Sequence, residues 1–291
     1  MHPDDFEHRA LRSFDGTTIA YQVAGRGPTI VLTNGLGGSY EAWARQVRAL
    51  GPGYRYVTWD YRGMFGSERP RDLATLAFDH QARDLELVLE AEGIERAIFV
   101  GLSLGVQLNF EYYRRRPEHF AGLVVLSGLP GRIFTSALGG PFLDPLLPYL
   151  ARGIQRSAPL LHGMNRRALR WKGLIPFAKR ARMVAPTLDE HVFAGILERF
   201  TSLDLEIWAE MVRHVGAHDA SEVLPRIDVP TLVISGSKDT ITPPAPVSAM
   251  ARRISRAELV IIEGGTHFAL YEFTEQVNGH LKRFVERVTR P

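Results

Sequence analysis

One stretch, residues 96–116, limits the possible folds of this chain more than any other. It contains a short apolar run at Ala97–Val100, then a serine between two glycines, and then a helical pattern that ends in three arginines. A short, continuous apolar run is typical of a strand buried on both faces of a parallel sheet. Cations at the end of the pattern favour the carboxyl end of a helix. The sequence therefore predicts a strand that stops at Ser103 and a helix that starts there.

The glycines on either side of this serine have a steric reason. A reversal as sharp as strand to helix leaves no room for Cβ atoms next to the turn, and Gly101 and Gly105 supply none. The serine is then held out of the sheet at a helix N-terminus, where backbone N–H groups face a developing anion. Gly-x-Ser-x-Gly in this setting is the nucleophile elbow. The chain accordingly resembles the α/β-hydrolase superfamily, in its serine esterase and enol-lactonase branch.

Strand-like and helix-like segments alternate on both sides of the elbow. A hairpin is predicted around Asp15-Gly16, and further buried strands are predicted at 29–33, 54–60, 122–128, 230–236 and 258–262. Such alternation favours a mostly parallel central sheet with helices on both faces, which is an α/β fold class. The resemblance implies the same architecture, with an inserted helical lid.

The alternation stops between residues 130 and 224. This stretch has helical patterns broken by prolines and no run that resembles a buried strand. We expect residues 1–129 and 225–291 to form the hydrolase core and residues 130–224 a helical cap. Within the cap, residues 152–182 carry nine Lys and Arg side chains and no Asp or Glu. This basic segment is either a solvated face of cap helices, a contact for an anionic substrate, or a docking surface for a membrane or a carrier protein.

Three chemically suited residues follow three predicted strands. Ser103, Asp239 and His267 occur in the order nucleophile, acid, base, and the ends of parallel strands lie at one edge of a sheet. A serine hydroxyl needs a histidine to accept its proton, and the histidine needs a carboxylate to orient it. We predict this triad, with Glu263 and Asp60 as alternative acids.

The loop Asn34-Gly35-Leu36-Gly37-Gly38 follows a central strand and is rich in glycine. By resemblance it supplies the oxyanion hole, formed by the backbone amides of Leu36 and of Leu104, which follows the nucleophile. Asn34 stands where relatives usually have histidine, although enol-lactone hydrolases also lack that histidine. Val106 stands where many relatives have a second glycine, and a side chain there is expected to push the helix slightly away from the sheet.

Substrate contacts are predicted for four residues. Asn34 and Phe268 flank the predicted oxyanion and base loops, Phe65 follows the turn after the 54–60 strand, and Trp208 belongs to the apolar surface of the cap. Phe65, with Met64, is expected to wall the pocket mouth. Apolar side chains of the cap are expected to line part of a hydrophobic pocket.

Composition excludes several classes of protein. The 291 residues contain no cysteine, so thiolate nucleophiles, thiolate metal sites and disulfides are excluded. The formal net charge is only +3, which does not indicate nucleic-acid binding. No metal-binding or nucleotide-binding motif is present, and we expect no metal and no cofactor. The first twelve residues lack the apolar core of a signal peptide, and no apolar run reaches the roughly 20 residues of a membrane span, so we expect a cytoplasmic protein.

The predicted function is hydrolysis of a small carboxylic ester or lactone through an acyl-enzyme. Other serine chemistries share the triad and stay open: carbon–carbon bond hydrolysis, thioester hydrolysis, cofactor-free perhydrolysis and biosynthetic cyclisation. A non-catalytic receptor is a further alternative, and the complete triad speaks against it. The sequence leaves the oligomeric state undetermined.

Overall fold

The computed structural model describes residues 5–131, 133, 171 and 173–290. Its centre is an eight-stranded sheet of order β1-β2-β4-β3-β5-β6-β7-β8. The strands are β1 (Glu7–Arg12), β2 (Thr18–Gly25), β3 (Thr29–Thr33), β4 (Arg55–Trp59), β5 (Ala97–Leu102), β6 (Phe120–Leu126), β7 (Thr231–Gly236) and β8 (Ala257–Ile262). Pairing is antiparallel for β1 with β2 and for β2 with β4, and parallel for all other neighbours. The predicted α/β fold with a mostly parallel sheet is confirmed.

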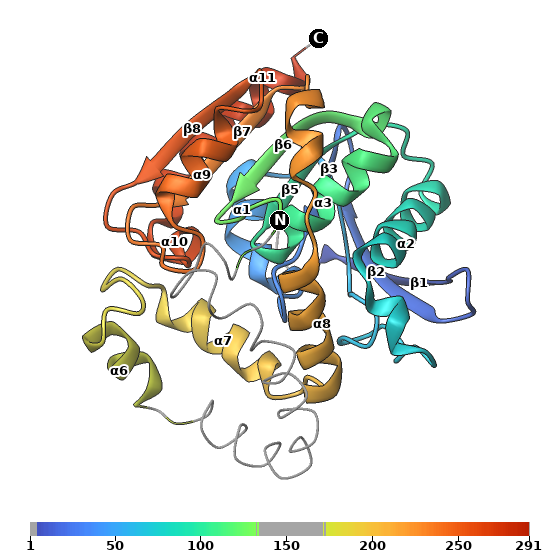
Figure 1. Cartoon of the computed structure of the whole chain (residues 1–291), viewed down its shortest axis with the longest axis horizontal. Coiled ribbons are helices and arrows are strands. Elements are labelled where there is room, and N and C mark those ends of the chain that lie inside the picture. The colour runs from blue at the N-terminus through green and yellow to red at the C-terminus, as the bar shows by residue number, and fades with distance from the viewer. Residues whose placement is uncertain (1–4, 132, 134–170, 172, 291) are drawn as a thin grey trace.

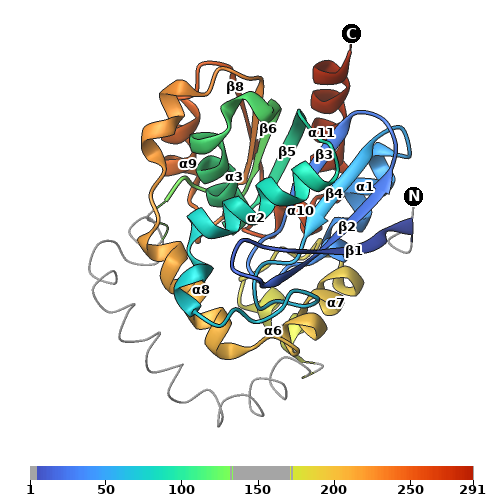
Figure 2. The same cartoon turned by 90° about the vertical axis from the view of Figure 1, so that its right-hand side faces the viewer.

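Helices cover both faces of the sheet (Figures 1 and 2). One face carries α2 (Phe78–Ala91), α3 (Leu104–Arg115) and α9 (Pro244–Ala251), and the other carries α1 (Ala44–Leu50) and α11 (Thr274–Thr289). Successive strand residues point to opposite faces of the sheet: Phe99 packs in the core beneath α2, α3 and α9, and Ile98 packs in the core beneath α1 and α11. Because both faces are covered, the central strands are apolar throughout, which is the pattern that identified them.

The described residues between β6 and β7 include the α-helices α6 (Leu174–Arg180), α7 (Glu190–Phe200) and α8 (Leu205–Ala217). They lie beyond one edge of the sheet (Figure 1), and Ile207, Met211 and Val215 of α8 also belong to the core on the α2 and α3 face. Side-chain carboxylates of Asp189 and Asp204 accept backbone N–H bonds at the starts of α7 and α8, which explains where these helices begin. The described part of 130–224 is therefore helical, as expected, whereas the division into core and cap domains stays a prediction.

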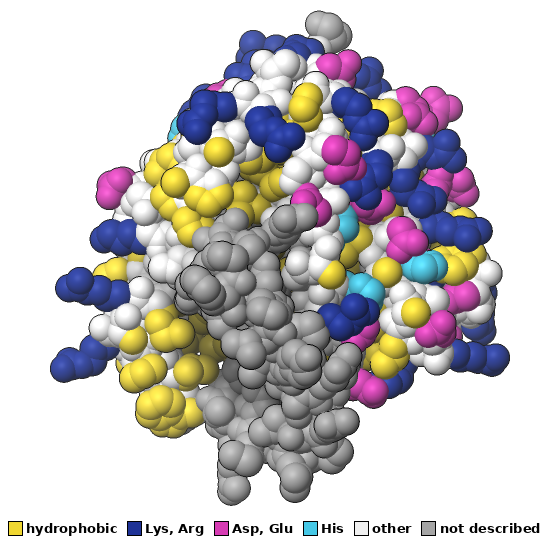
Figure 3. All heavy atoms as spheres, viewed as in Figure 1, with side chains coloured by type: hydrophobic (Ala, Val, Ile, Leu, Met, Phe, Trp, Pro, Cys, Tyr) yellow, Lys and Arg dark blue, Asp and Glu magenta, His cyan; other side chains and the backbone are white. Residues whose placement is uncertain are grey.

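Most of the basic segment 152–182 lies outside the described residues. In its described part, Lys179 is paired with Glu190 at 2.6 Å. Hydrophobic side chains gather over α6 on the face shown in Figure 3, and Trp171, Phe177 and Met183 are 58%, 53% and 63% exposed. Across the described part of the chain, no helix combines the length and apolarity needed to cross a bilayer.

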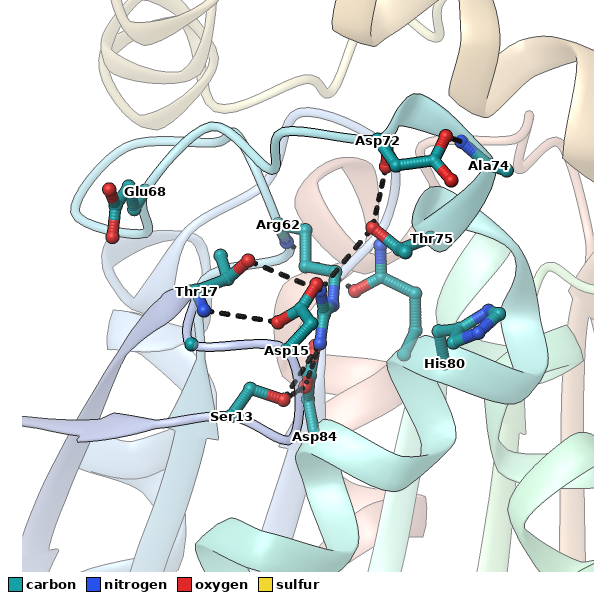
Figure 4. Close-up of polar contacts among 12 residues, drawn as sticks. Ser13, Asp15, Thr17, Arg62, Glu68, Asp72, Ala74, Thr75, His80 and Asp84 are labelled. Carbon is teal, nitrogen blue, oxygen red and sulfur yellow. Dashed lines mark hydrogen bonds and ion pairs between the residues drawn. The ribbon is translucent and has the colours of Figure 1, made fainter.

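A charged cluster is buried where the β1–β2 turn meets the loop after β4. The Arg62 side chain is fully buried and reaches Asp84 on α2 at 2.5 Å and Asp15 at 2.6 Å (Figure 4). The hydroxyl of Ser13 accepts a hydrogen bond from Arg62 and donates one to Asp84. This cluster joins the hairpin, α2 and the loop after β4, so Arg62 fixes the position of that loop.

Candidate active site

The candidate nucleophile lies on a strained turn. Ser103 sits between β5 and α3 with φ 53° and ψ −113°, a conformation that non-glycine residues rarely adopt. Its N–H is held by the carbonyl of Leu126 at 2.9 Å. A Cβ atom at Gly105 would lie 2.2 Å from the carbonyl oxygen of Thr33, so only glycine allows α3 to approach β3 this closely. The local sequence therefore forces the serine side chain out at the end of the strand.

Val106 also has an explanation in the packing of the elbow. Its side chain is 1% exposed, and a Cβ atom at Gly128 would lie 2.4 Å from its Cγ2 atom. Glycine in the loop after β6 therefore provides the space that Val106 fills.

The structure brings Ser103, His267 and Asp239 together. The Oγ atom of Ser103 lies 2.9 Å from Nε2 of His267, and Nδ1 of His267 lies 3.0 Å from Oδ2 of Asp239. These residues follow β5, β8 and β7, which all end at the same edge of the sheet. The geometry allows His267 to accept the serine proton while Asp239 holds the ring.

The loops after β7 and β8 are fastened to one another. Ser237 and Lys238 donate backbone N–H bonds to the carbonyls of Ile262 and Gly265 at 2.9 and 2.8 Å. In return, the Ser237 hydroxyl accepts the N–H of Gly264 at 2.9 Å. These bonds fix the distance between the carboxylate and the imidazole.

Asp239 is surrounded by donors. Besides His267, the N–H groups of Ile241 and Thr242 donate to Oδ1 at 2.8 Å each, and the Thr242 hydroxyl donates to Oδ2 at 2.6 Å. Burial is the largest effect on this carboxyl and by itself raises its pKa, but His267 and Thr242 outweigh it, and the pKa is lowered below the ordinary value. Asp239 therefore stays ionised, as a group that stabilises a histidine cation must.

The two alternative acids lie elsewhere. Glu263 is exposed, and the hydrogen bonds of the Asp60 carboxyl come from Gly66 and Gln22. Among the candidate acids, Asp239 alone contacts His267 in the described residues.

Asp60 nevertheless has an unusual environment, from which a pH dependence of stability follows. Burial raises its pKa to about 6, because the hydrogen bonds from Gly66 and Gln22, which lower the pKa, offset the effect of burial only in part. A raised pKa means that the folded state binds the proton more tightly, so this stabilisation is complete below the unfolded pKa of 3.8 and disappears as the pH rises through about 6. Between about pH 5 and pH 7.5 the loss amounts to about 1.4 kcal/mol. Asp60→Asn should remove this component, and urea unfolding of both proteins at the two pH values measures it. An equal change in the free energy of unfolding of both proteins between the two pH values would show that Asp60 is not the group responsible.

A small cavity of about 200 Å³ opens next to Ser103 and His267. Its lining residues are mostly apolar: Asn34, Gly35, Leu36, Gly38, Ala42, Trp43, Leu102, Ser103, Ile196, Phe200, His267, Phe268 and Tyr271. They come from the loop after β3, from the elbow, from α7 and from the loop after β8. Apart from His267, no Lys, Arg, His, Asp or Glu side chain from the described residues takes part in the lining.

Four predicted substrate contacts have different outcomes. Phe268 lines this cavity and packs edge-on against His267 at 5.8 Å between ring centroids. Phe65 does not line it but lines a neighbouring cavity with Tyr40 and Arg199. Trp208 does not line it either and packs against the core on the α2 and α3 face. Substrate contact by Phe65 and Trp208 stays a prediction that the described cavity does not support.

Asn34 lines the cavity, but its side chain is engaged in the framework. Its amide nitrogen donates to the Thr58 hydroxyl and the Trp59 carbonyl at 3.2 and 3.0 Å, and its Oδ1 accepts the indole N–H of Trp43 at 2.8 Å. Asn34 thus joins the ends of β3 and β4 to the segment before α1. It positions the loop that contains Leu36 rather than offering its amide to a ligand.

The predicted oxyanion donors lie on both sides of the nucleophile. Leu36 lines the cavity in a turn closed by the Gly38 N–H and the Gly35 carbonyl at 2.9 Å. Leu104 is the first residue of α3, where a backbone N–H has no acceptor within the helix. Both amides are therefore suited to receive a negative oxygen.

The segment before α7 is attached to the loop that contains His267. The Glu272 carboxyl, 4% exposed, accepts the N–H of Ala185 at 2.7 Å, and the N–H and hydroxyl of Thr266 at 2.7 and 2.6 Å. Asp189 adds a backbone bond to Tyr271 at 3.0 Å and an ion pair with Arg45 at 2.6 Å. Glu272, which sequence reasoning missed, therefore holds both the base loop and the inserted segment.

No group of three or more metal-ligating side chains that could hold an ion occurs among the described residues.

Comparison with known proteins identifies the family of this fold. The sequence model of a family described as alpha/beta hydrolase fold matches residues 28–274. A protein from Synechocystis sp., named as a proposed non-haem chloroperoxidase, is 26% identical to this chain, and the match covers 92% of this chain and 95% of that protein. RutD of Pseudomonas savastanoi, named as a proposed carbamate hydrolase, is 29% identical over 82% of this chain and 86% of its own. Among solved structures, the enol-lactonase from Burkholderia xenovorans LB400 has the same fold, with a TM-score of 0.75, 24% identity and coverage of 95% of this chain and 99% of its own.

Proposed function

Because this chain belongs to the α/β-hydrolase fold family, we propose that it is a serine hydrolase that cleaves a small carboxylic ester or lactone through an acyl-enzyme. The observation that carries the proposal is the continuous contact from Ser103 through His267 to Asp239, with 2.9 and 3.0 Å between the bonded atoms. The apolar cavity beside Ser103 supports a substrate with an uncharged group at the reacting carbonyl.

The first half of the reaction forms the acyl-enzyme. His267 Nε2 takes the proton of the Ser103 hydroxyl as Oγ bonds to the carbonyl carbon, and the carbonyl oxygen becomes an anion. The N–H groups of Leu36 and Leu104 receive that anion. The tetrahedral intermediate collapses when the bond to the leaving oxygen breaks and His267 gives its proton to that oxygen. Asp239 stabilises the histidine cation between the two transfers.

The second half releases the acid. A water molecule loses a proton to His267 and bonds to the acyl carbon, and the same two N–H groups receive the oxyanion again. Collapse breaks the bond to Ser103 Oγ, and the proton on His267 returns to this oxygen. The free carboxylic acid leaves, and the site is restored.

The test of the proposal is covalent labelling followed by turnover. A fluorophosphonate probe should label the wild-type protein at one serine, identified by mass spectrometry as Ser103. 4-Nitrophenyl esters of two to ten carbons, a set of lactones and an aryl carbamate then define the bond cleaved, and acetate with hydrogen peroxide tests perhydrolysis. The carbamate and peroxide arms follow from the names of the relatives. Folded protein that neither labels nor turns over any of these compounds would favour the binding-protein alternative.

The proposed acid makes a separate prediction. Asp239→Asn should lower kcat for the best ester about ten-thousandfold, because an amide cannot stabilise the cation and favours the wrong histidine tautomer. Asp60→Asn is the matched control, since this buried carboxyl makes no contact with His267. Steady-state kinetics of both variants should separate them by at least a thousandfold. Equal losses of kcat in the two variants would show that Asp239 is not the acid of the triad.

A further inference from the structure

The cavity beside Ser103 contains one hydroxyl that the proposed reaction does not use. Among the described lining residues, side-chain hydrogen-bonding groups belong to Asn34, Trp43, Ser103, His267 and Tyr271. The amide of Asn34 and the indole of Trp43 bond to each other and to the framework, and Ser103 bonds to His267. The Tyr271 hydroxyl is the group left over.

Tyr271 is buried without a hydrogen-bond partner for its hydroxyl among the described residues. Its side chain is 6% exposed, and the described contacts include none at the phenol oxygen. The other buried tyrosines of the described chain all have such a partner: Tyr21 with Glu92, Tyr56 with Gly51, Tyr61 with Asn34, Tyr112 with His119 and Tyr113 with Arg226. The Tyr271 oxygen is not one of the fully enclosed unpaired polar atoms of the described chain, so it keeps some accessible surface, and Tyr271 lines the cavity. A ligand group that covered this hydroxyl without bonding to it would cost about 1–3 kcal/mol.

The position of this side chain is fixed. Tyr271 belongs to α10 (Ala269–Glu272), its N–H bonds to the Phe268 carbonyl at 2.8 Å, and its carbonyl accepts the N–H of Asp189 at 3.0 Å. Burial raises its pKa well above the ordinary value, so the group stays a neutral phenol that can both donate and accept. The hydroxyl is therefore held in place at the wall of the cavity.

We propose that the Tyr271 hydroxyl recognises a polar atom on the acyl group of the substrate. The proposal rests on the proposed function. Because the acyl group stays bonded to Ser103 until water releases it, the cavity around this serine is where that group lies. The substrates so assigned are esters or lactones whose short, uncharged acyl part carries an ether, carbonyl or hydroxyl oxygen away from the reacting carbonyl. An acyl group that carries a carboxylate is disfavoured, since the described lining contains no Lys or Arg.

The same hydroxyl also determines which substrates are rejected. A site that provides a hydrogen bond in a desolvated place discriminates against an analogue that leaves the protein group unpaired. A plain hydrocarbon acyl chain would cover the Tyr271 hydroxyl and offer it no hydrogen-bond partner. Tyr271 is in this sense a residue that determines specificity and takes no part in bond cleavage.

The experiment replaces one methylene of the acyl chain at a time by oxygen. The substrates are 4-nitrophenyl hexanoate and its three ether analogues with oxygen at position 3, 4 or 5, and the proteins are wild type, Tyr271→Phe and Tyr113→Phe. Tyr113→Phe removes a buried hydroxyl that bonds to Arg226 and does not line the cavity. The measured quantity is the ratio of kcat/KM for each ether to that for hexanoate, in which the intrinsic reactivity of each ester cancels between proteins.

We expect the ratio for at least one ether to fall roughly three- to tenfold in Tyr271→Phe and to stay unchanged in Tyr113→Phe. Equal ratios in wild type and Tyr271→Phe for all three ethers would overturn the proposal. If Tyr271→Phe does not fold, Tyr271→Leu takes its place in the same comparison. A wild-type protein with a kcat/KM for every ether no higher than that for hexanoate would also overturn the proposal. Failure of the proposed function looks different: wild type cleaves no ester, or Ser103→Ala cleaves them equally well.

Discussion

Ser103→Ala is expected to reduce kcat/KM for the best ester by a factor on the order of 10⁵, to a rate set by whatever binding and oxyanion contacts provide alone. The reason lies in the geometry of the elbow. Without the Oγ atom no acyl-enzyme forms, and His267 has no proton to accept from the protein. Because the two residues act as one unit, His267→Ala should cost about as much, and the double variant little more than either single variant.

Ser127→Ala is the matched control for this experiment. Ser127 lies at the end of β6, next to β5, is 3% exposed and has a φ of 46°, close to the 53° of Ser103. Its backbone N–H is held by the Ile234 carbonyl, as that of Ser103 is held by Leu126. It does not line the cavity. Ser127→Ala therefore removes a hydroxyl from a strained serine at a strand end without removing a contact to His267. We expect its kcat/KM to be close to that of the wild type. Comparable activity in Ser103→Ala and Ser127→Ala would falsify the assignment of the nucleophile.

Arg62→Met is expected to lower the free energy of unfolding by roughly 3–5 kcal/mol. Both Arg62 and Asp84 have fully buried side chains, and removing the cation leaves a carboxylate with the Ser13 hydroxyl as its remaining partner. Burial already raises the pKa of Asp84, even with Arg62 beside it. Part of the cost in the variant is therefore the uptake of a proton, and the loss of stability should grow as the pH rises.

Two further variants locate the cause of this loss. Arg62→Met combined with Asp84→Leu should recover most of the stability, because an apolar pair of similar volume leaves no fully buried charge unpaired. Asp15 also loses its cation, but its side chain is 24% exposed and keeps the bond from the Thr17 N–H. Arg69→Met removes a cation from an exposed contact with Asp204 and Glu206 and should cost at most about 1 kcal/mol. Urea unfolding curves provide all four free energies. A single variant Arg62→Met within 1 kcal/mol of wild type would show that the buried pair contributes little.

The sequence was sufficient for the parts of this molecule that depend on local pattern. Ser103, Asp239 and His267 each follow an apolar run, and the parallel arrangement of those runs places their ends at one edge. No knowledge of side-chain direction was needed, because a residue directly after a strand in this fold lies at that edge. The predicted segments differ from the observed ones by a few residues at their ends. The strand predicted at 54–60, for example, is observed at Arg55–Trp59, and the one predicted at 258–262 is observed at Ala257–Ile262.

The sequence did not allow us to predict side-chain directions or hydrogen-bond partners that are distant in the chain. Phe65 lies in the loop after β4 and lines another cavity, and nothing in Asp-Tyr-Arg-Gly-Met-Phe indicates that direction. The Asn34 amide is engaged by Trp43, Thr58 and Trp59, whose proximity depends on how three loops pack. Tyr271 and Glu272 follow His267 by four and five residues, and this spacing was the only hint that they belong to the site.

The double attachment of Glu272 has a consequence for protein engineering. In a chimera in which residues 130–224 are exchanged for the corresponding segment of a relative, the backbone N–H of another residue has to take the place of the Ala185 N–H at this buried carboxyl. If the new segment placed no donor there, Glu272 would keep only its bonds to Thr266, and the attachment between the inserted segment and the residue next to the base would be lost. Successful exchange therefore requires that position 272 and the donor at position 185 be transplanted together, as one matched pair from the same parent.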